Sequence, residues 1–195
     1  LRNKTNEELA VLLKESTGEQ YDLNKLTEIV HLMKERATFI KDILIEGDYL
    51  VNRPTSYDEQ TVAKKWKAES VGLMNEWMDR LEKVEPFDHA SIEQAFQLFL
   101  SDKQMGVGAV LPLFRLLVTG TGMGPSMFSI AEFLGKEVCI TRMQNGLKIV
   151  EELKSNVTWP AWAEVQRLTI VVAVFSVVFA LATWGVDEVF AKALA

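Results

Sequence analysis

One segment near the end of the sequence constrains the chain more than any other, because residues 168–186 contain no charged side chain. A helix of this length spans roughly 28 Å, which is close to the hydrocarbon core of a bilayer at about 30 Å. Core helices of soluble proteins seldom run so far without a polar face. We therefore expect residues 168–186 to form one transmembrane helix, and a buried helix of a soluble protein is the alternative.

The residues that flank this segment predict its orientation. Arg167 directly precedes it, whereas Asp187 and Glu188 directly follow it. Basic flanks stay on the cytoplasmic side, so the N-terminal side of the helix is expected in the cytoplasm. Trp184 lies near the other end, where an amphipathic ring meets the lipid headgroups. We expect a cytoplasmic N-terminal domain and a membrane anchor.

The residues before the apolar segment combine an amphipathic pattern with a proline motif. Leu147, Val150 and Leu153 recur at helical spacing opposite charged side chains. Such a helix is suited to lie in the membrane interface. The sequence Val-Thr-Trp-Pro at 157–160 then interrupts it, and proline at the first turn of a helix predicts that a new helix starts there.

An amphipathic helix, a proline hinge and one apolar span in this order resemble SecE, the small essential subunit of the bacterial protein translocase. The resemblance covers residues 147–195 and rests on Thr158, Trp159 and Pro160 of the hinge and on the acidic Glu164 that follows. It implies two partners: the channel subunit SecY, which the segment would clamp, and the lipid bilayer. The membrane would be the inner membrane, with the chain oriented N-in and C-out.

Residues 1–146 have the pattern of a soluble all-α domain. Apolar residues recur there at intervals of three and four, and no run shows the alternation expected of a strand. Gly47 and Pro86 end expected helices, and Pro54 lies in a break between two of them. The expected helices cover residues 1–14, 22–45, 58–66, 69–84, 91–100, 107–118, 126–134 and 137–145.

No catalytic or cofactor-binding motif occurs in the same region. Gly120, Gly122 and Gly124 lie between two expected helices without a preceding strand, so they form neither a P-loop nor a dinucleotide fingerprint. Cys139 is expected to be a small core residue. His89 is expected to be a solvated turn residue. With one Cys and two His in the whole chain, the sequence predicts no metal site and no cofactor.

The charge balance bears on nucleic-acid binding. A net charge of −6 argues against capture of nucleic acid by overall charge, although it permits a local basic groove. Lys64, Lys65 and Lys67 form a small basic cluster. The cluster either contacts phosphates or, as the simpler alternative, lies on a solvated helix face.

Three stretches of the first 146 residues resemble the C-terminal half of bacterial glutamyl-tRNA synthetase. These stretches are LMKERATFIKDI at 32–43, PTSYDEQTVAKKWK at 54–67 and a longer block at 106–137. The resemblance covers residues 5–146 and implies a cage of α-helices that binds a tRNA anticodon.

The block at 106–137 is the most specific part of this resemblance. An apolar helix ends in Arg-Leu-Leu-Val-Thr-Gly at 115–120, a Gly-Pro-Ser-Met-Phe turn follows at 124–128, and Leu-Gly-Lys-Glu follows at 134–137. The chain departs from the family pattern at 138–140, where Val-Cys-Ile replaces a more charged stretch.

The resemblance also implies an RNA-binding site made of Arg115, Gly124, Pro125, Met127 and Phe128. Proteins read RNA loops by packing splayed bases on planar or apolar side chains and by hydrogen bonds to base edges. The Pro, Met and Phe side chains would supply the apolar surface, and Arg115 would reach a base edge or a phosphate. Two alternatives stay open: Phe128 holds the turn as a core residue, and Arg115 forms a salt bridge inside the helical cage.

The ATP-binding motifs of the synthetase are absent, since the sequence has neither His-x-Gly-His nor Lys-Met/Leu-Ser-Lys. We therefore expect no ligase activity. The chain is expected to combine an anticodon-binding domain for glutamate tRNA at 1–146 with a SecE-like segment at 147–195. The alternative is a SecE-like membrane protein with a merely structural helical carrier, joined naturally, artefactually or by engineering. A generic membrane-anchored interaction protein is a third class.

Overall fold

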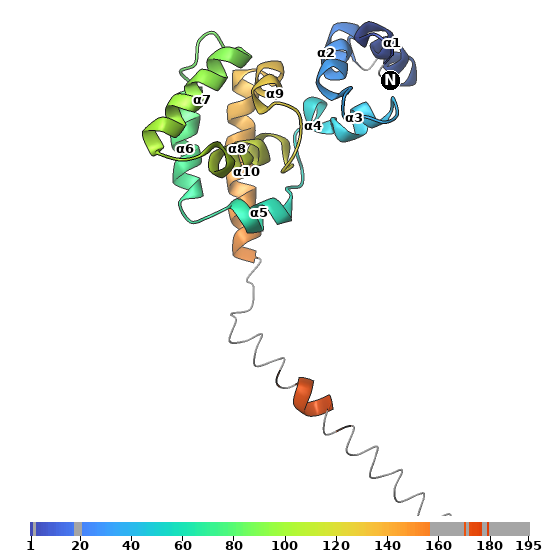
Figure 1. Ribbon diagram of the computed structural model, residues 1–195. Helices are drawn as coiled ribbons and strands as arrows, with labels where there is room; N and C mark the ends of the chain where they lie inside the picture. The colour runs from blue at the N-terminus through green and yellow to red at the C-terminus, as the bar shows by residue number, and fades with distance from the viewer. Residues whose placement is uncertain (2, 18–20, 157–169, 171, 177–178, 180–195) are drawn as a thin grey trace, which may run out of the picture. The chain divides into compact units, whose positions relative to one another are not determined.

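The computed structural model describes residues 1, 3–17, 21–156, 170, 172–176 and 179. The chain divides into two compact units, Leu1–Lys154 and Ser155–Ala195, and each is described by itself. Throughout the described part of the first unit the regular elements are helices without a strand (Figure 1), which confirms the all-α expectation. The helices are α1 (Asn6–Thr17), α2 (Leu23–Met33), α3 (Asp42–Glu46), α4 (Asp48–Val51), α5 (Glu59–Lys65), α6 (Ser70–Leu81), α7 (His89–Lys103), α8 (Val107–Thr119), α9 (Met127–Leu134) and α10 (Lys136–Asn156).

The single helix expected over 22–45 is wrong in its second half. Helix α2 begins after Asp22, whose side chain caps it by accepting from the backbone N–H of Asn24, and it ends at Met33. Between α2 and α3, the Asp42 carboxylate accepts from the backbone N–H of Phe39 at 2.7 Å. A short acidic side chain that bonds nearby backbone competes with the helical ladder, which explains the break.

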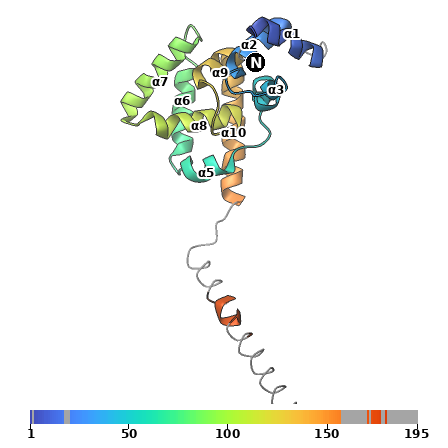
Figure 2. The ribbon, with the colours of Figure 1, turned by 45° about the vertical axis from the view of Figure 1, so that its right-hand side comes forward.

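The core of the C-terminal helices is built around Trp77 of α6. Its ring meets Phe96 at 5.0 Å and both Phe99 and Phe114 at 5.5 Å between centroids, and all four side chains are fully buried. Edge-to-face and tilted pairs of this kind stabilise a core beyond the area that they bury. The cluster joins α6, α7 and α8, which lie together in both ribbon views (Figures 1 and 2).

A buried arginine links early and late parts of the chain. The Nη1 atom of Arg142 on α10 donates to the carbonyl oxygen of Tyr49 on α4 and, at 3.3 Å, to that of Val118 on α8. Burial lowers the pKa of Arg142. Among the neighbouring groups that raise this pKa, Cys139 has the largest effect. The two carbonyl oxygens therefore accept hydrogen bonds from a guanidinium group that burial has removed from water, and they offset part of the cost of burying its charge.

Helix α10 runs without interruption through residue 146, where the sequence analysis places a domain boundary. A Cβ atom on Gly146 would lie 2.9 Å from the Leu117 carbonyl oxygen, so the absence of a side chain allows α10 to cross α8 closely. Leu147 and Val150 are buried in the core of the first unit, and Leu153 packs partly against it. This apolar face was expected in the membrane interface, but in the structure it covers the protein core.

Few residues of the expected transmembrane segment are described. Residues 172–176 are helical, and the Ser176 hydroxyl donates to the Val172 carbonyl oxygen at 2.9 Å. The described apolar side chains here, Phe175 among them, are exposed. Within the described residues no helix has the length and apolar character needed to cross a membrane. Most of 168–186 lies outside those residues.

Candidate nucleic-acid interface

The candidate site is the turn that joins α8 to α9. Helix α8 ends at Thr119, and the C-cap residue Gly120 has a left-handed φ of 75°. The backbone N–H of Gly120 donates to the Leu116 carbonyl oxygen. A Cβ atom at Gly120 would lie 2.5 Å from the Ser56 carbonyl oxygen. The Gly120 carbonyl oxygen in turn accepts from the backbone N–H of Asp58 at 2.8 Å. Glycine is thus required both by the backbone angle and by the close approach of the loop before α5.

The next glycine of the turn also packs against α5. A Cβ atom at Gly122 would lie 2.1 Å from Thr61 Oγ1 and 2.8 Å from Asp58 Oδ2. Asp58 is the N-cap of α5: it accepts from the backbone N–H of Gln60 at 3.1 Å and from the Thr61 hydroxyl at 2.6 Å. These hydrogen bonds, led by that of Thr61, lower the pKa of the Asp58 carboxyl. The start of α5 therefore forms the floor under the turn.

Arg115 lies behind the turn and is 8% exposed. Its Nη2 atom donates to the Pro125 carbonyl oxygen at 2.7 Å, while Nη1 is buried without a hydrogen-bond partner among the described residues. A Cβ atom at Gly124 would lie 2.6 Å from Nη1. Burial lowers the pKa of Arg115, and the nearby Tyr49 opposes the shift. Arg115 therefore holds the turn from the inside, rather than forming the salt bridge considered as an alternative.

The other sequence-predicted side chains divide into buried and accessible groups. Met127 and Phe128 are buried, and the Phe128 ring lies 5.5 Å from that of Phe96. Gly124 and Pro125 are partly exposed. Met123, which the sequence analysis did not single out, is 79% exposed and is the most accessible apolar side chain of the turn. Its position beside the Gly-Pro-Ser-Met-Phe motif was the only signal in the sequence.

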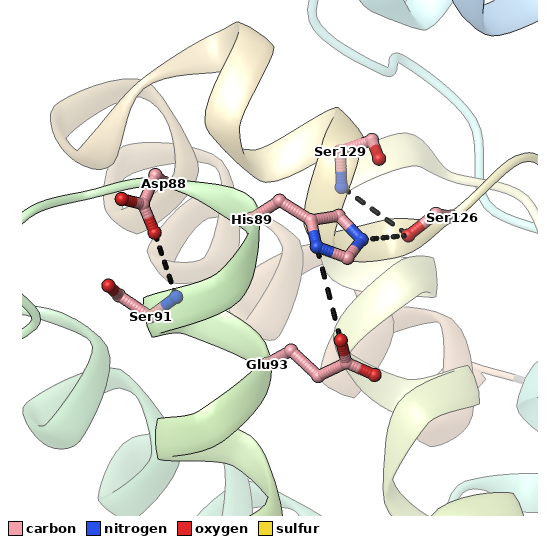
Figure 3. A network of polar contacts seen from close by, with 6 residues as sticks. All are labelled: Asp88, His89, Ser91, Glu93, Ser126 and Ser129. Carbon is pink, nitrogen blue, oxygen red and sulfur yellow. Dashed lines mark hydrogen bonds and ion pairs between the residues drawn. The ribbon is translucent and has the colours of Figure 1, made fainter.

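Figure 3 shows a polar network that joins the turn to α7. The Ser126 hydroxyl caps α9 by accepting from the Ser129 N–H at 3.4 Å, and it lies 3.3 Å from His89 Nε2. His89 Nδ1 lies 3.9 Å from a Glu93 carboxylate oxygen, and its ring meets Phe128 edge-on at 5.8 Å. His89 is therefore the first residue of α7 and not a turn residue as expected, although its side chain is 41% exposed.

The reason for this correction lies in the start of α7. Asp88 is the N-cap of that helix, and its carboxylate accepts from the Ser91 N–H at 2.8 Å. The helix consequently begins at His89, two residues before the predicted start, and its first turn carries His89 toward Ser126 (Figure 3). An Asp that lies two residues after a proline and directly before a helical pattern is a recognisable N-cap signal, and it is present in the sequence.

The remaining predicted residues fall beyond the described part of the chain. Thr158, Trp159, Pro160 and Glu164, which carry the resemblance to SecE, lie outside the described residues. Among the residues that the structure describes, no group of three His, Cys, Asp or Glu side chains is arranged to hold a metal ion. The candidate site within the described residues is therefore the α8–α9 turn with its supports from α5 and α7.

The fold and this site define an all-helical domain whose glycine-rich α8–α9 turn is held by a buried arginine. The model of the family "Anticodon binding domain" matches residues 7–147, and the chain belongs to this family. The model of "SecE/Sec61-gamma subunits of protein translocation complex" matches residues 148–195. Both resemblances found in the sequence are confirmed by these matches.

Known proteins similar to the chain are glutamate–tRNA ligases. The ligase of Amoebophilus asiaticus is 31% identical over 153 residues, covering 77% of this chain and 30% of the relative. That of Flavobacterium johnsoniae is 38% identical over 133 residues, covering 68% of this chain and 26% of the relative. The crystal structure of a glutamate tRNA ligase from Elizabethkingia meningosepticum matches with a TM-score of 0.70 and 28% identity, covering 76% of this chain and 30% of that one. The chain thus spans 26–30% of the length of these relatives.

Proposed function

We propose that residues 7–147 bind the anticodon stem-loop of glutamate tRNA through the α8–α9 turn. The observation that carries the proposal is the buried Arg115, which fixes the Pro125 carbonyl and so gives the turn one defined shape. A preformed turn binds a splayed RNA loop at a lower entropic cost than a mobile one. The proposal also draws on the relatives, which are named as glutamate–tRNA ligases.

The roles of the individual side chains follow from their exposure. RNA bases would pack on the accessible Met123, Gly124 and Pro125, whereas Met127 and Phe128 would support the turn from the core. Arg115 would act by positioning the turn. Apolar contact with Met123 would then contribute about 1–2 kcal/mol of binding free energy, as expected for burying two or more methylene equivalents.

The test is a filter-binding titration of the full chain in mild detergent against glutamate tRNA and against a tRNA with an unrelated anticodon. We expect tighter binding of glutamate tRNA, and we expect Met123→Ala to reduce that preference without changing the thermal unfolding midpoint. Leu98→Ala is the matched control, because Leu98 is 58% exposed on α7. Equal affinity of the wild-type chain for both tRNAs would contradict the proposed recognition of the anticodon.

We also propose that residues 1–195 alone do not charge tRNA with glutamate. The chain covers 26–30% of the ligases it resembles and lacks both of their ATP motifs. The check is an aminoacylation assay with glutamate, ATP and glutamate tRNA, in which an intact bacterial ligase serves as the positive control. Charging of tRNA by the purified chain would refute this part of the proposal.

For the C-terminal segment we propose a SecE-like role, in which residues 148–195 clamp SecY and cross the inner membrane N-in and C-out. The match of residues 148–195 to the SecE family and the charges of Arg167, Asp187 and Glu188 support it. A reporter fused to the C-terminus should read periplasmic. Val178→Arg should cost about 2.5–3.5 kcal/mol of insertion free energy and shift the chain out of the membrane fraction.

A second candidate function is a SecE-like protein whose N-terminal domain is only a structural carrier. The continuity of α10 favours it, because Leu147 and Val150 tie the start of the SecE-like segment to the helical domain. The two candidates are separated by combining copurification with SecY and the tRNA titration. If the chain copurifies with SecY but does not bind tRNA, the N-terminal domain is supported as a structural carrier.

A further inference from the structure

A hollow of about 450 Å³ lies between α5, the start of α6 and the corner that joins α7 to α8. Three lysines from the end of α5 and the residues after it line this space, together with one acidic residue, Glu69. We call it the lysine hollow and define it by Lys64, Lys65, Lys67, Leu73, Met105 and Leu113. Its position differs from that of the α8–α9 turn, and neither family match assigns it a role.

The local sequence explains why the lysines gather here. Val62 and Trp66 lie four residues apart and are both buried, so the charged residues between them are left on the outer side of α5. After Trp66 the chain bends, and the backbone N–H of Lys67 donates to the buried Ser70 hydroxyl at 2.8 Å. The bend brings Lys67 to the same hollow as the lysines of α5.

Contacts within the protein satisfy this positive charge only weakly. Lys65 Nζ donates to the Gly108 carbonyl oxygen at 3.3 Å, across the hollow to α8. Lys67 Nζ lies 3.9 Å from a Glu69 carboxylate oxygen, and both of these side chains are well exposed. An exposed pair at this distance contributes little to stability. The lining of the hollow holds three lysines and one carboxylate, and Lys64 also interacts electrostatically with Asp58. Two carboxylates for three lysines still leave a local positive potential in a chain whose net charge is −6.

The wall and floor of the lysine hollow are apolar. Leu73 and Leu113 are buried, and Met105 packs partly against the core. Helix α8 begins beside the hollow at Val107, and no side chain caps its first turn, so the positive end of the helix dipole adds to the lysine charges. Cationic groups above an apolar surface suit a sugar–phosphate backbone, which is anionic at the phosphates and less polar at the sugars.

One helix connects this hollow to the proposed anticodon turn. The N-terminal end of α5 supports the turn, since the backbone N–H of Asp58 donates to the Gly120 carbonyl oxygen, and the C-terminal end carries Lys64 and Lys65. Seven helical residues rise roughly 10 Å, which is short compared with an RNA stem. An RNA bound at the turn would therefore have its backbone within reach of the hollow.

We propose that the lysine hollow binds backbone phosphates of the tRNA stem without regard to base sequence. This inference rests on the proposed tRNA binding and adds a second contact to it. The turn would supply the preference for one anticodon, and the hollow would supply affinity common to all tRNAs. Phosphate contacts of this kind make binding depend on salt, with a slope of roughly 0.7–0.9 in log K against log salt for each contact.

The test measures RNA affinity over a salt series with the full chain in mild detergent. The probes are glutamate tRNA and a tRNA with an unrelated anticodon. The variant is Lys64→Gln/Lys67→Gln, which keeps the Lys65 hydrogen bond, and the matched control is Lys25→Gln/Lys41→Gln, two exposed lysines of the N-terminal helical region. Thermal unfolding by circular dichroism verifies that all proteins are folded.

We expect the Lys64→Gln/Lys67→Gln variant to weaken binding of both tRNAs by the same factor and to lower the salt slope by about 0.7–1.8. The control should keep the wild-type slope. If the wild-type chain prefers glutamate tRNA but the variant keeps the wild-type salt slope, phosphate binding by the lysine hollow is contradicted and the proposed anticodon recognition is supported. If the variant has a smaller salt slope but the wild-type chain binds both tRNAs equally, phosphate binding by the lysine hollow is supported and the proposed anticodon recognition is contradicted.

Two further outcomes would also overturn the proposal. If the wild-type chain binds neither tRNA, both the hollow and the proposed function fail. In a parallel assay with vesicles that contain an anionic phospholipid, binding should be the same for the variant and the wild type. If the variant loses vesicle binding but keeps its RNA slope, the hollow serves lipid headgroups and the RNA assignment is wrong.

Discussion

Arg115 and Pro125 are joined by a hydrogen bond of 2.7 Å, from the guanidinium Nη2 atom at the end of α8 to the carbonyl oxygen in the turn. Both groups lie at the place where the sequence predicts RNA contact, yet the arginine is buried beneath the turn. The bond links an apolar helix to the backbone of the loop that follows it. The shape of the candidate site thus depends on a charged side chain that faces the protein.

The first prediction concerns this bond. Arg115→Ala should lower the free energy of unfolding by about 1.5–3 kcal/mol, because it removes a charge-assisted hydrogen bond and leaves the Pro125 carbonyl unsatisfied. Urea denaturation followed by circular dichroism measures the change. Arg115→Lys is the comparison and should recover part of the loss, since it restores a donor without the planar guanidinium. Equal stability of the Ala variant and the wild type would contradict the positioning role.

The second prediction contrasts two glycines. Gly120→Ala should destabilise the domain by about 1–3 kcal/mol, because φ is 75° and the new Cβ would lie 2.5 Å from the Ser56 carbonyl oxygen. Gly72→Ala should stabilise it by about 0.5–1 kcal/mol, since this position lies inside α6 with nothing within 4 Å of the new atom. Thermal unfolding midpoints of the two variants should therefore move in opposite directions.

These glycines also illustrate what sequence reasoning can reach. Helices α8 and α9 could be predicted because their apolar residues are periodic and a run of glycines separates them. The burial of Arg115 could not, since it depends on the path of the turn up to Pro125 and on Tyr49, which comes from a distant part of the chain. The sequence shows Lys64, Lys65 and Lys67 as a basic cluster, but it does not show that they line a hollow, because the α7–α8 corner supplies the far wall.

The same comparison explains two errors in the helix boundaries. Side chains of Asp42 and Asp88 bond to nearby backbone N–H groups, and each sets a helix limit that hydrophobic periodicity alone does not reveal. Periodicity reports which face of a helix is apolar, whereas its ends depend on single hydrogen bonds. For Leu147 and Val150 the apolar face was identified, but whether protein or lipid covers that face depends on tertiary packing.

A third prediction follows from the low pKa of Asp58. Because folding lowers this pKa below its ordinary value of 3.8, the ionised carboxylate stabilises the native state above that value. The contribution is lost as the pH falls through the lowered pKa. Asp58→Asn keeps an acceptor for the α5 cap but does not titrate. Urea midpoints at pH 6 and pH 3 should therefore differ less for this variant than for the wild type, and an equal difference would contradict the assignment.

The fourth prediction concerns the thiol of Cys139. Burial raises its pKa to about 12, and Arg142 opposes the shift only in part. The reactive thiolate is scarce at pH 8 under these conditions, and the side chain has no exposed area. A disulfide reagent that reports a chromophore should label the thiol only after denaturant is added. Rapid labelling of the native protein would show that the first unit opens around α10.

The last prediction concerns where the helical domain ends. A chain that stops after Gly146 loses Leu147 and Val150, which are buried in the core, and Leu153, which packs partly against it. Burying a Leu or Val side chain contributes about 1.5–3 kcal/mol, so this truncation should cost roughly 3–6 kcal/mol of unfolding free energy. That is a large part of the 5–15 kcal/mol that typical domains possess.

A chain that stops after Lys154 keeps these contacts and should unfold cooperatively at a higher temperature. Circular dichroism melts of the two truncated chains, with Leu147→Ala in the longer one, test the argument. The substitution should lower stability by about 2–5 kcal/mol, as for other buried leucines. Identical melting of the two truncated chains would place the domain boundary at residue 146 and would release the amphipathic helix for the membrane interface, as its sequence pattern alone predicts.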